Sequence, residues 1–137
     1  MNELGIFKFD QRHSWFEGQA DWLGKKCTVY LDTDIKGGQT ADKAFQHLKT
    51  LYADLQEWDK KFRTYAAEEL TDFINELFYE ENPLTEQQFA ERLFVAEMRI
   101  SPSGEIVVYY VDEIFDGQAV QVLINSEGEL ILAELEG

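Results

Sequence analysis

The chain has 137 residues, of which 45% are apolar and 14% aromatic, enough for one sizeable core but not for two. It carries 27 acidic residues against 12 basic ones, which gives a formal net charge of -15. Nucleic acids and anionic membranes are bound through clustered Lys and Arg. We therefore expect a single domain, residues 1–137, that binds neither of them.

The N-terminus and the cysteine content bear on where the protein resides. No basic segment precedes an apolar run at the N-terminus, and no stretch reaches the roughly 18 apolar residues of a membrane helix. The lone Cys27 cannot form an internal disulfide and lies in a strand-like run, so we expect it to be buried. These features favour a reducing, cytoplasmic location.

The first part of the chain has the pattern of a β-meander. Residues 4–9, 16–22 and 27–31 alternate between apolar and polar, which is the period of two typical of strands. The polar residues 10–14 and the Gly-containing segment 23–26 separate these runs as turns. The sequence therefore predicts three antiparallel strands at the N-terminus.

A helical pattern fills the middle of the chain. Thr40 can cap its start, with Asp42 near the positive end of the helix dipole. Apolar residues then recur at helical spacing, without Gly or Pro, as far as Asn82. One helix of about forty residues would be about 60 Å long, whereas the radius of gyration expected for this domain is about 14 Å. We therefore expect a break between Leu55 and Thr64.

Local signals mark the start of a further helix. Thr85 and Gln88 have the spacing of a capping box, and Leu84 and Phe89 stand at the two positions of a hydrophobic staple. These signals predict a short helix over residues 86–93.

Strand-like runs complete the chain at residues 94–100, 105–111, 119–124 and 130–135. Residues 106–111 are apolar on both sides, which places this run inside the sheet. Short connections between consecutive strands favour antiparallel pairing, with the helices gathered in one layer. The expected fold is therefore α+β, a mostly antiparallel sheet with two to three helices packed on one face.

The order of several short segments is distinctive. The segments are Trp15-Phe16-Glu17-Gly18, the run 27–31, Trp58-Asp59, Ala66-Ala67-Glu68-Glu69-Leu70 and residues 83–89. In this order, over nearly the whole chain, they resemble the bacterial family called domain of unknown function 2262. The resemblance implies an α+β fold and brings no established activity. The family pattern has Gly-His where this sequence has Gly117-Gln118, so no role of that histidine is carried over.

Side chains able to perform chemistry are few and scattered. His13 stands near Asp10 and Ser14, a combination that could support nucleophilic catalysis, but the run is typical of a polar turn between strands. His47 has no His or Cys four residues further along, so a helical zinc site is not expected. The glycine-rich loop of a phosphate site is missing as well. We therefore expect neither a metal nor a cofactor, and the sequence names no catalytic residue.

Carboxylates are the remaining candidates for catalysis. Two groups could hold a divalent cation or act on a substrate. They are Asp32 with Asp34, and the loop residues Asp112, Glu113 and Asp116. Neither group has the spacing of a calcium loop, and acidic residues are ordinary at strand ends. The loop group is the alternative site if the protein is a small enzyme.

An acidic row is the most unusual surface that the sequence predicts. It comprises Glu68, Asp72, Glu76 and Glu80, at intervals of four, with Glu69 and Tyr79 on the same side of the second helix. Like charges at this spacing repel by about 0.2–0.5 kcal/mol per pair. Three interpretations remain open. The row is a solvated face screened by salt, or Lys60, Arg92 or Arg99 neutralises it, or it docks a basic partner with Tyr79 as an aromatic anchor.

Two hypotheses of function follow. The favoured one is a non-enzymatic protein-binding module whose acidic surface docks a basic protein, and an immunity-type protein that masks a basic toxin would be one form of it. The alternative is a small enzyme that uses carboxylates on an unidentified substrate or metal. An exposed aromatic residue rimmed by acid favours the first, and a deep pocket holding two carboxylates with separated pKa values favours the second.

Overall fold

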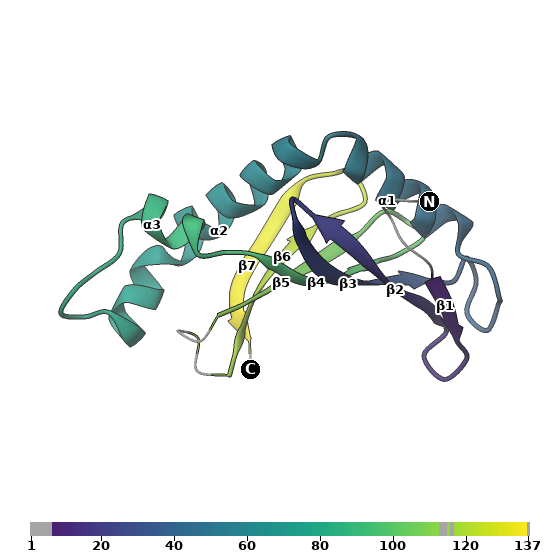
Figure 1. The fold of residues 1–137 in the computed structure, drawn as a ribbon, viewed down its shortest axis with the longest axis horizontal. Helices are drawn as coiled ribbons and strands as arrows, with labels where there is room; N and C mark the ends of the chain where they lie inside the picture. Colours follow the sequence, from purple (N-terminus) through teal and green to yellow (C-terminus); the bar gives the residue numbers. More distant parts are fainter. Residues whose placement is uncertain (1–6, 113–114, 116, 137) are drawn as a thin grey trace.

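A seven-stranded sheet forms the centre of the computed structural model, which describes residues 7–112, 115 and 117–136 (Figure 1). The strands lie side by side in chain order, and every neighbouring pair is antiparallel except β3 and β4, which are parallel. They are β1 (Phe7–Asp10), β2 (Trp15–Trp22), β3 (Lys25–Asp32), β4 (Val95–Ile100), β5 (Ile106–Val111), β6 (Ala119–Ile124) and β7 (Leu130–Glu136).

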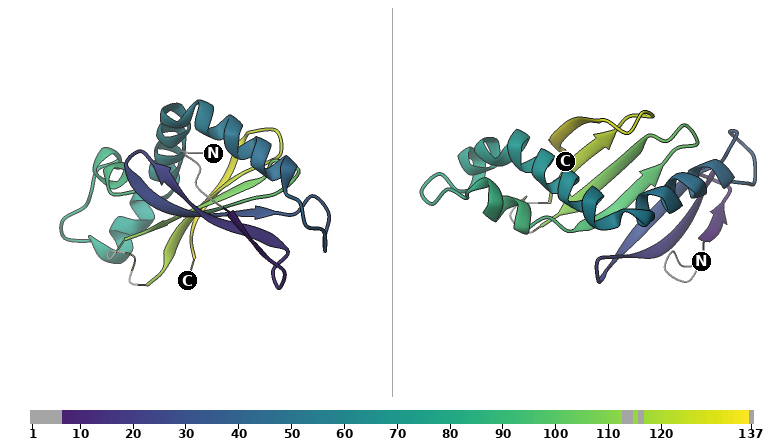
Figure 2. Two further views of the ribbon diagram at one scale, coloured as in Figure 1. Left: turned by 45° about the vertical axis from the view of Figure 1, so that its right-hand side comes forward. Right: turned by 90° about the horizontal axis from the view of Figure 1, so that it is seen from above.

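Three helices connect β3 to β4 and cover one face of the sheet (Figures 1 and 2). They are α1 (Asp42–Ala53), α2 (Leu55–Phe78) and α3 (Glu86–Glu91). Two neighbouring strands that run in the same direction need a long crossover, and the helices supply it. The predicted α+β fold, a mostly antiparallel sheet with helices on one face, is confirmed.

The N-terminal meander is confirmed for the residues that the structure describes. β2 and β3 are joined by Leu23 and Gly24, whose φ angles of 49° and 92° are both positive. Two successive positive φ angles give the tight hairpin turn whose twist matches the flanking strands. Residues 4–6 of the first predicted run lie outside the described residues.

The helical region breaks at Asp54, one residue before the predicted window. Asp54 has φ -136° and ψ 44°, and α2 then runs without a break for 24 residues. The predicted window was wrong because α2, once started at Leu55, does not have to end over the sheet and needs no later break. At about 1.5 Å per residue α2 is about 36 Å long, and its C-terminal end projects past the strands (Figures 1 and 2).

Asp34, and not Thr40, caps the start of α1. The Asp34 carboxylate accepts hydrogen bonds from the backbone N–H of Lys43 at 2.9 Å and of Asp42 at 3.3 Å. The Thr40 hydroxyl donates to the same carboxylate at 2.8 Å. These hydrogen bonds, that from Lys43 first, hold the pKa of Asp34 below its ordinary value of 3.8. Thr40 therefore orients the capping group instead of being that group.

The capping box of α3 is confirmed. Thr85 Oγ1 accepts from the N–H of Gln88 at 3.1 Å, and the Gln88 side chain accepts from the N–H of Thr85 at 2.9 Å. The helix ends at Glu91, two residues before the predicted end, and the strand that follows begins at Val95. The run 106–111 lies inside the sheet, as predicted, between β4 and β6.

The core lies between the sheet and the helices. Side chains from both layers are fully buried there, among them Val29, Leu48, Phe62, Val108 and Val122. Cys27 belongs to this core, with 1% of its surface exposed, as predicted. Burial raises the pKa of its thiol to about 11.

Candidate functional site

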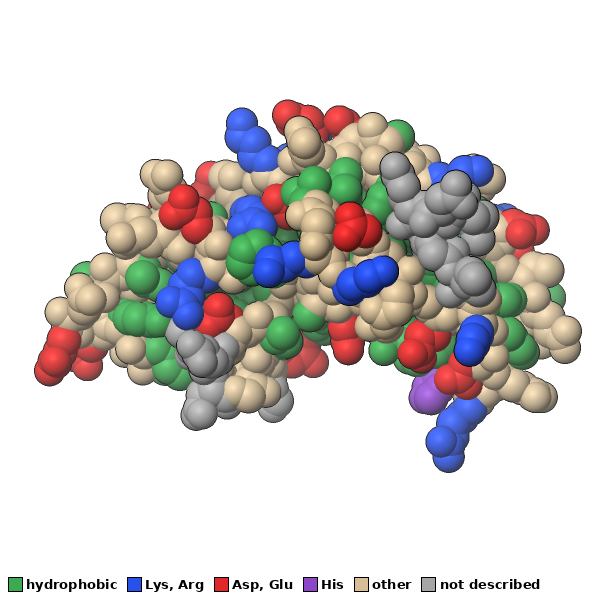
Figure 3. All heavy atoms as spheres, in the orientation of Figure 1, with side chains coloured by type: hydrophobic (Ala, Val, Ile, Leu, Met, Phe, Trp, Pro, Cys, Tyr) green, Lys and Arg blue, Asp and Glu red, His purple; other side chains and the backbone are tan. Residues whose placement is uncertain are grey.

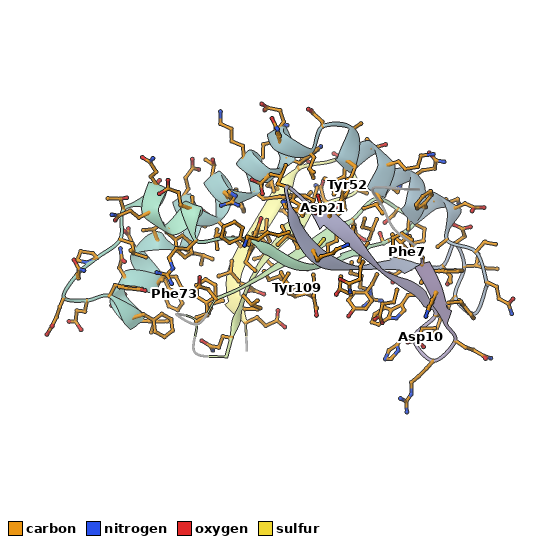
Figure 4. The ribbon with its side chains drawn as sticks, viewed as in Figure 1. Phe7, Asp10, Asp21, Tyr52, Phe73 and Tyr109 are labelled. Carbon is orange, nitrogen blue, oxygen red and sulfur yellow. The ribbon has the colours of Figure 1, made fainter. Side chains whose placement is uncertain are left out.

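The projecting end of α2 exposes two large apolar side chains. Phe62 and Ala66, earlier in the helix, are fully buried over the sheet. Phe73 and Leu77 lie within about 60° of them around the helix axis, yet 46% and 51% of their surfaces are exposed. Figure 4 shows Phe73 on the part of α2 that has passed the strands. The two side chains are exposed because the sheet does not continue beneath them.

The acidic row lies beside this apolar pair. The carboxylates of the row and that of Glu69 beside it are all exposed; they belong to Glu68, Glu69, Asp72, Glu76 and Glu80. None of them forms an ion pair with another part of the chain that the structure describes. Figure 3 shows acidic side chains at the left-hand tip of the molecule, where α2 connects to α3, and Glu80 stands in that connection, after the last residue of α2. We refer to Phe73, Leu77 and these five acidic residues as the α2 tip surface.

The arginines that could have neutralised the row bind other carboxylates. Arg92 pairs with Asp112 at 2.9 Å, and Arg99 pairs with Asp32 at 2.9 Å. Lys60 lines a shallow hollow with Glu68, without an ion pair between them. The carboxylates of the α2 tip surface are therefore exposed, and in the described chain none of them forms an ion pair with these three residues.

Two residues of the predicted site differ from their expected positions. Glu80 lies beyond the end of α2, which stops at Phe78. The helix ends there because the Asn75 side chain donates to the carbonyl of Leu84 at 2.8 Å and accepts from its N–H at 2.7 Å, which draws the chain back against α2. Tyr79 follows the last helical residue and packs half-buried against the core. Phe73 therefore offers more free aromatic surface to a partner than Tyr79 does.

The alternative acidic loop contributes one described carboxylate. Asp112 lies against the Arg92 guanidinium at 2.9 Å, while Glu113 and Asp116 lie outside the described residues. Phe115 of the same loop is fully buried and meets Phe89 edge to face at 6.3 Å. The described part of this loop is therefore attached to the core.

The residues of the possible nucleophilic site do not assemble. His13 Nδ1 lies 2.9 Å from the Asp10 carboxylate, and this hydrogen bond lowers the pKa of Asp10. The Ser14 hydroxyl instead hydrogen-bonds Thr33 Oγ1 at 2.8 Å and accepts the N–H of Gly37 at 3.1 Å. Ser14 thus holds the loop after β3 and is not activated by His13.

The other candidate cation ligands, Asp32 and Asp34, and the second histidine, His47, bind neighbouring groups of the fold. Asp32 pairs with Arg99, and Asp34 caps α1. His47 is half-buried, with Nε2 3.1 Å from the carbonyl oxygen of Pro102. Among the described residues no three His, Cys, Asp or Glu side chains are grouped closely enough to hold a metal ion.

A large hollow lies elsewhere, between the N-terminal strands and the start of α1. Its volume is about 950 Å³, and its walls include Phe7, Phe16 and Phe45. The two carboxylates on its wall, Glu17 and Asp42, are both exposed. The hollow does not bring together the carboxylates that the enzyme hypothesis named.

A comparison with known proteins finds a family to which the chain is similar. The model of the family described as an uncharacterized protein conserved in bacteria, DUF2262, matches residues 1–135. No curated protein and no solved structure was found to match. None of the helices in the described ranges combines the length and the apolar character that crossing a membrane requires.

Proposed function

The chain belongs to the DUF2262 family, and we propose that it is a non-enzymatic, cytoplasmic protein-binding module that docks a basic protein on the α2 tip surface. The observation that carries the proposal is the exposure of Phe73 and Leu77, at 46% and 51%, beside carboxylates that have no cationic partner in the described chain. An immunity-type protein that masks a basic toxin is one form of such a module.

The two kinds of group supply different parts of binding. Burying the exposed halves of Phe73 and Leu77 is worth on the order of 1 kcal/mol each. The carboxylates attract a cationic partner, speed its encounter and fix its orientation. Cations from the partner also relieve the repulsion along the row, which is about 0.2–0.5 kcal/mol for each pair four residues apart. An apolar centre surrounded by a polar rim is the usual anatomy of a protein–protein interface.

Affinity capture from the lysate of the native host tests the proposal. The tagged chain is compared with an Asp72→Asn/Glu76→Gln variant at low and high salt. A Glu57→Gln/Glu127→Gln variant is the matched control, because it removes the same charge from exposed positions outside the row. We expect the wild type and the control to retain a basic protein at low salt, and the row variant to lose it. Equal retention by all three proteins would overturn the proposal.

A further inference from the structure

We infer that the partner presents a basic amphipathic helix, about three turns long, to the α2 tip surface; this inference rests on the docking function proposed above. The surface has two parallel rows along the helix axis. Phe73 and Leu77 form the apolar row, and three members of the acidic row, Glu68, Asp72 and Glu76, lie on α2 beside it. Members of each row are four residues apart, which is about 6 Å along the axis.

The spacing of the two rows matches that of a helical partner. A helix repeats its own side chains at i and i+4, again about 6 Å apart, so apolar and cationic residues on one helix can face both rows at once. The stretch from Glu68 to Leu77 is about 14 Å long at 1.5 Å per residue, or between two and three turns. This length sets the extent of the partner helix.

The backbone of α2 argues against an extended partner. A strand binds by adding to a sheet edge, where its backbone groups find partners. The backbone groups of α2 are already bonded within the helix, so a strand laid on Phe73 and Leu77 would bury N–H and C=O groups without partners. A helix satisfies its own backbone before it docks.

The two flanks of the apolar row differ, which determines how the partner helix must face. The acidic row lies on one flank. On the other flank Leu70 and Ile74 are buried, at 6% and 0% exposed. The partner therefore carries its cations along one side of its apolar stripe only. A second copy of this chain does not fit, because each copy carries a net charge of -15 and the two would repel.

Two synthetic peptides of identical composition test this inference. Both contain about 14 residues of Leu, Lys and Ala, enough for about four turns of helix. One places Leu at helical spacing with Lys along a single flank, and the other alternates Leu and Lys with the period of a strand. Titration calorimetry gives the affinity for the full-length protein, and circular dichroism gives the helicity gained on binding.

We expect the helical-pattern peptide to bind at least about tenfold more tightly than the alternating peptide, a difference of about 1.4 kcal/mol, and to gain helicity. A Phe73→Ala/Leu77→Ala variant should weaken this binding by about tenfold or more. An Ile35→Ala/Val111→Ala variant, which truncates two other exposed apolar residues, should bind like the wild type.

Equal binding of the two peptides, or binding without a gain in helicity, would overturn the inference. The proposed docking function would still stand after that result if the Asp72→Asn/Glu76→Gln variant had lost its basic protein in the capture experiment. Unchanged binding of the helical-pattern peptide to the Phe73→Ala/Leu77→Ala variant would also overturn the inference of a helical partner, because the peptide would then be bound elsewhere on the protein.

Discussion

The indole N–H of Trp22 donates a 2.8 Å hydrogen bond to the carboxylate of Asp59, joining β2 to α2 inside the core. The second Asp59 oxygen accepts from Arg63 Nε at 2.8 Å, and Arg63 also donates to the carbonyl of Ala90 in α3 at 2.7 Å. Asp59 is only 8% exposed. This network ties β2 to the first half of α2 and to α3, ahead of the end of α2 that projects past the strands, and so helps to hold α2 in the direction in which the α2 tip surface projects.

Removing the Asp59 carboxylate should destabilise the protein strongly. In Asp59→Ala the indole of Trp22 and the guanidinium of Arg63 lose a charged acceptor in a buried place, a loss of about 2–4 kcal/mol. Urea unfolding measures it. Glu57→Ala, an exposed carboxylate in the first turn of the same helix, is the control and should change stability by less than about 0.5 kcal/mol. A similarly small change for Asp59→Ala would show that the network does not hold the fold.

Replacing the buried Tyr110, in contrast to Asp59, should not destabilise the protein. Its side chain is fully buried, and its hydroxyl has no hydrogen-bond partner in the described part of the chain. Burial also raises the pKa of this hydroxyl. Because Tyr110→Phe removes a buried polar atom without breaking a bond, we expect stability to be unchanged or higher by up to about 1 kcal/mol. A loss greater than about 1 kcal/mol in the same urea assay would contradict this.

Cys27 should react slowly with thiol reagents in the folded protein. A pKa of about 11 in place of the ordinary 9.0 lowers the thiolate fraction near pH 8 by about a hundredfold, and the thiol is 1% exposed. We expect a disulfide reagent such as dithiobis-nitrobenzoate to label the protein fully in denaturant and at least about a hundredfold more slowly without it. Equal labelling rates in the two conditions would mean that Cys27 is accessible.

The cap of α1 should make stability depend on pH in acid. The pKa of Asp34 is lowered in the folded protein, so its contribution is complete above the unfolded value of 3.8 and is lost as the pH falls through the folded value. Asp34→Ala should therefore be less stable than the wild type at about pH 6, and this difference should shrink below about pH 4. Unfolding curves across this pH range measure the difference. A difference that stays constant to low pH would show that the charge of Asp34 is not involved.

Local signals in the sequence predicted most of the fold. Alternation predicted the strands, the capping box at Thr85 predicted the start of α3, and the short connections predicted antiparallel pairing. Each of these signals depends on neighbouring residues alone. The cap of α1 escaped prediction because Asp34 lies eight residues before the helix and reaches it through the loop after β3. A capping residue can be recognised from the sequence only when it is adjacent to the helix that it caps.

The candidate site was predicted in part, for a related reason. Helical spacing placed the carboxylates of Asp72 and Glu76 on one side of α2, where the structure also has them exposed. The same spacing placed Phe73 and Leu77 with the apolar side, and nothing in the sequence marks where the sheet beneath that side ends. Periodicity gives the direction of a side chain, whereas burial depends on what lies opposite it. The apolar half of the α2 tip surface therefore required the structure.

The binding of the captured basic protein to a Phe73→Ser/Leu77→Ser variant tests the central claim most directly. Both residues are about half exposed, so the change should lower the unfolding free energy by about 2 kcal/mol at most, while the lost anchors weaken binding by about tenfold or more. Unchanged binding together with a loss of several kcal/mol in stability would contradict the account, because it would show that Phe73 and Leu77 serve the fold and not a partner.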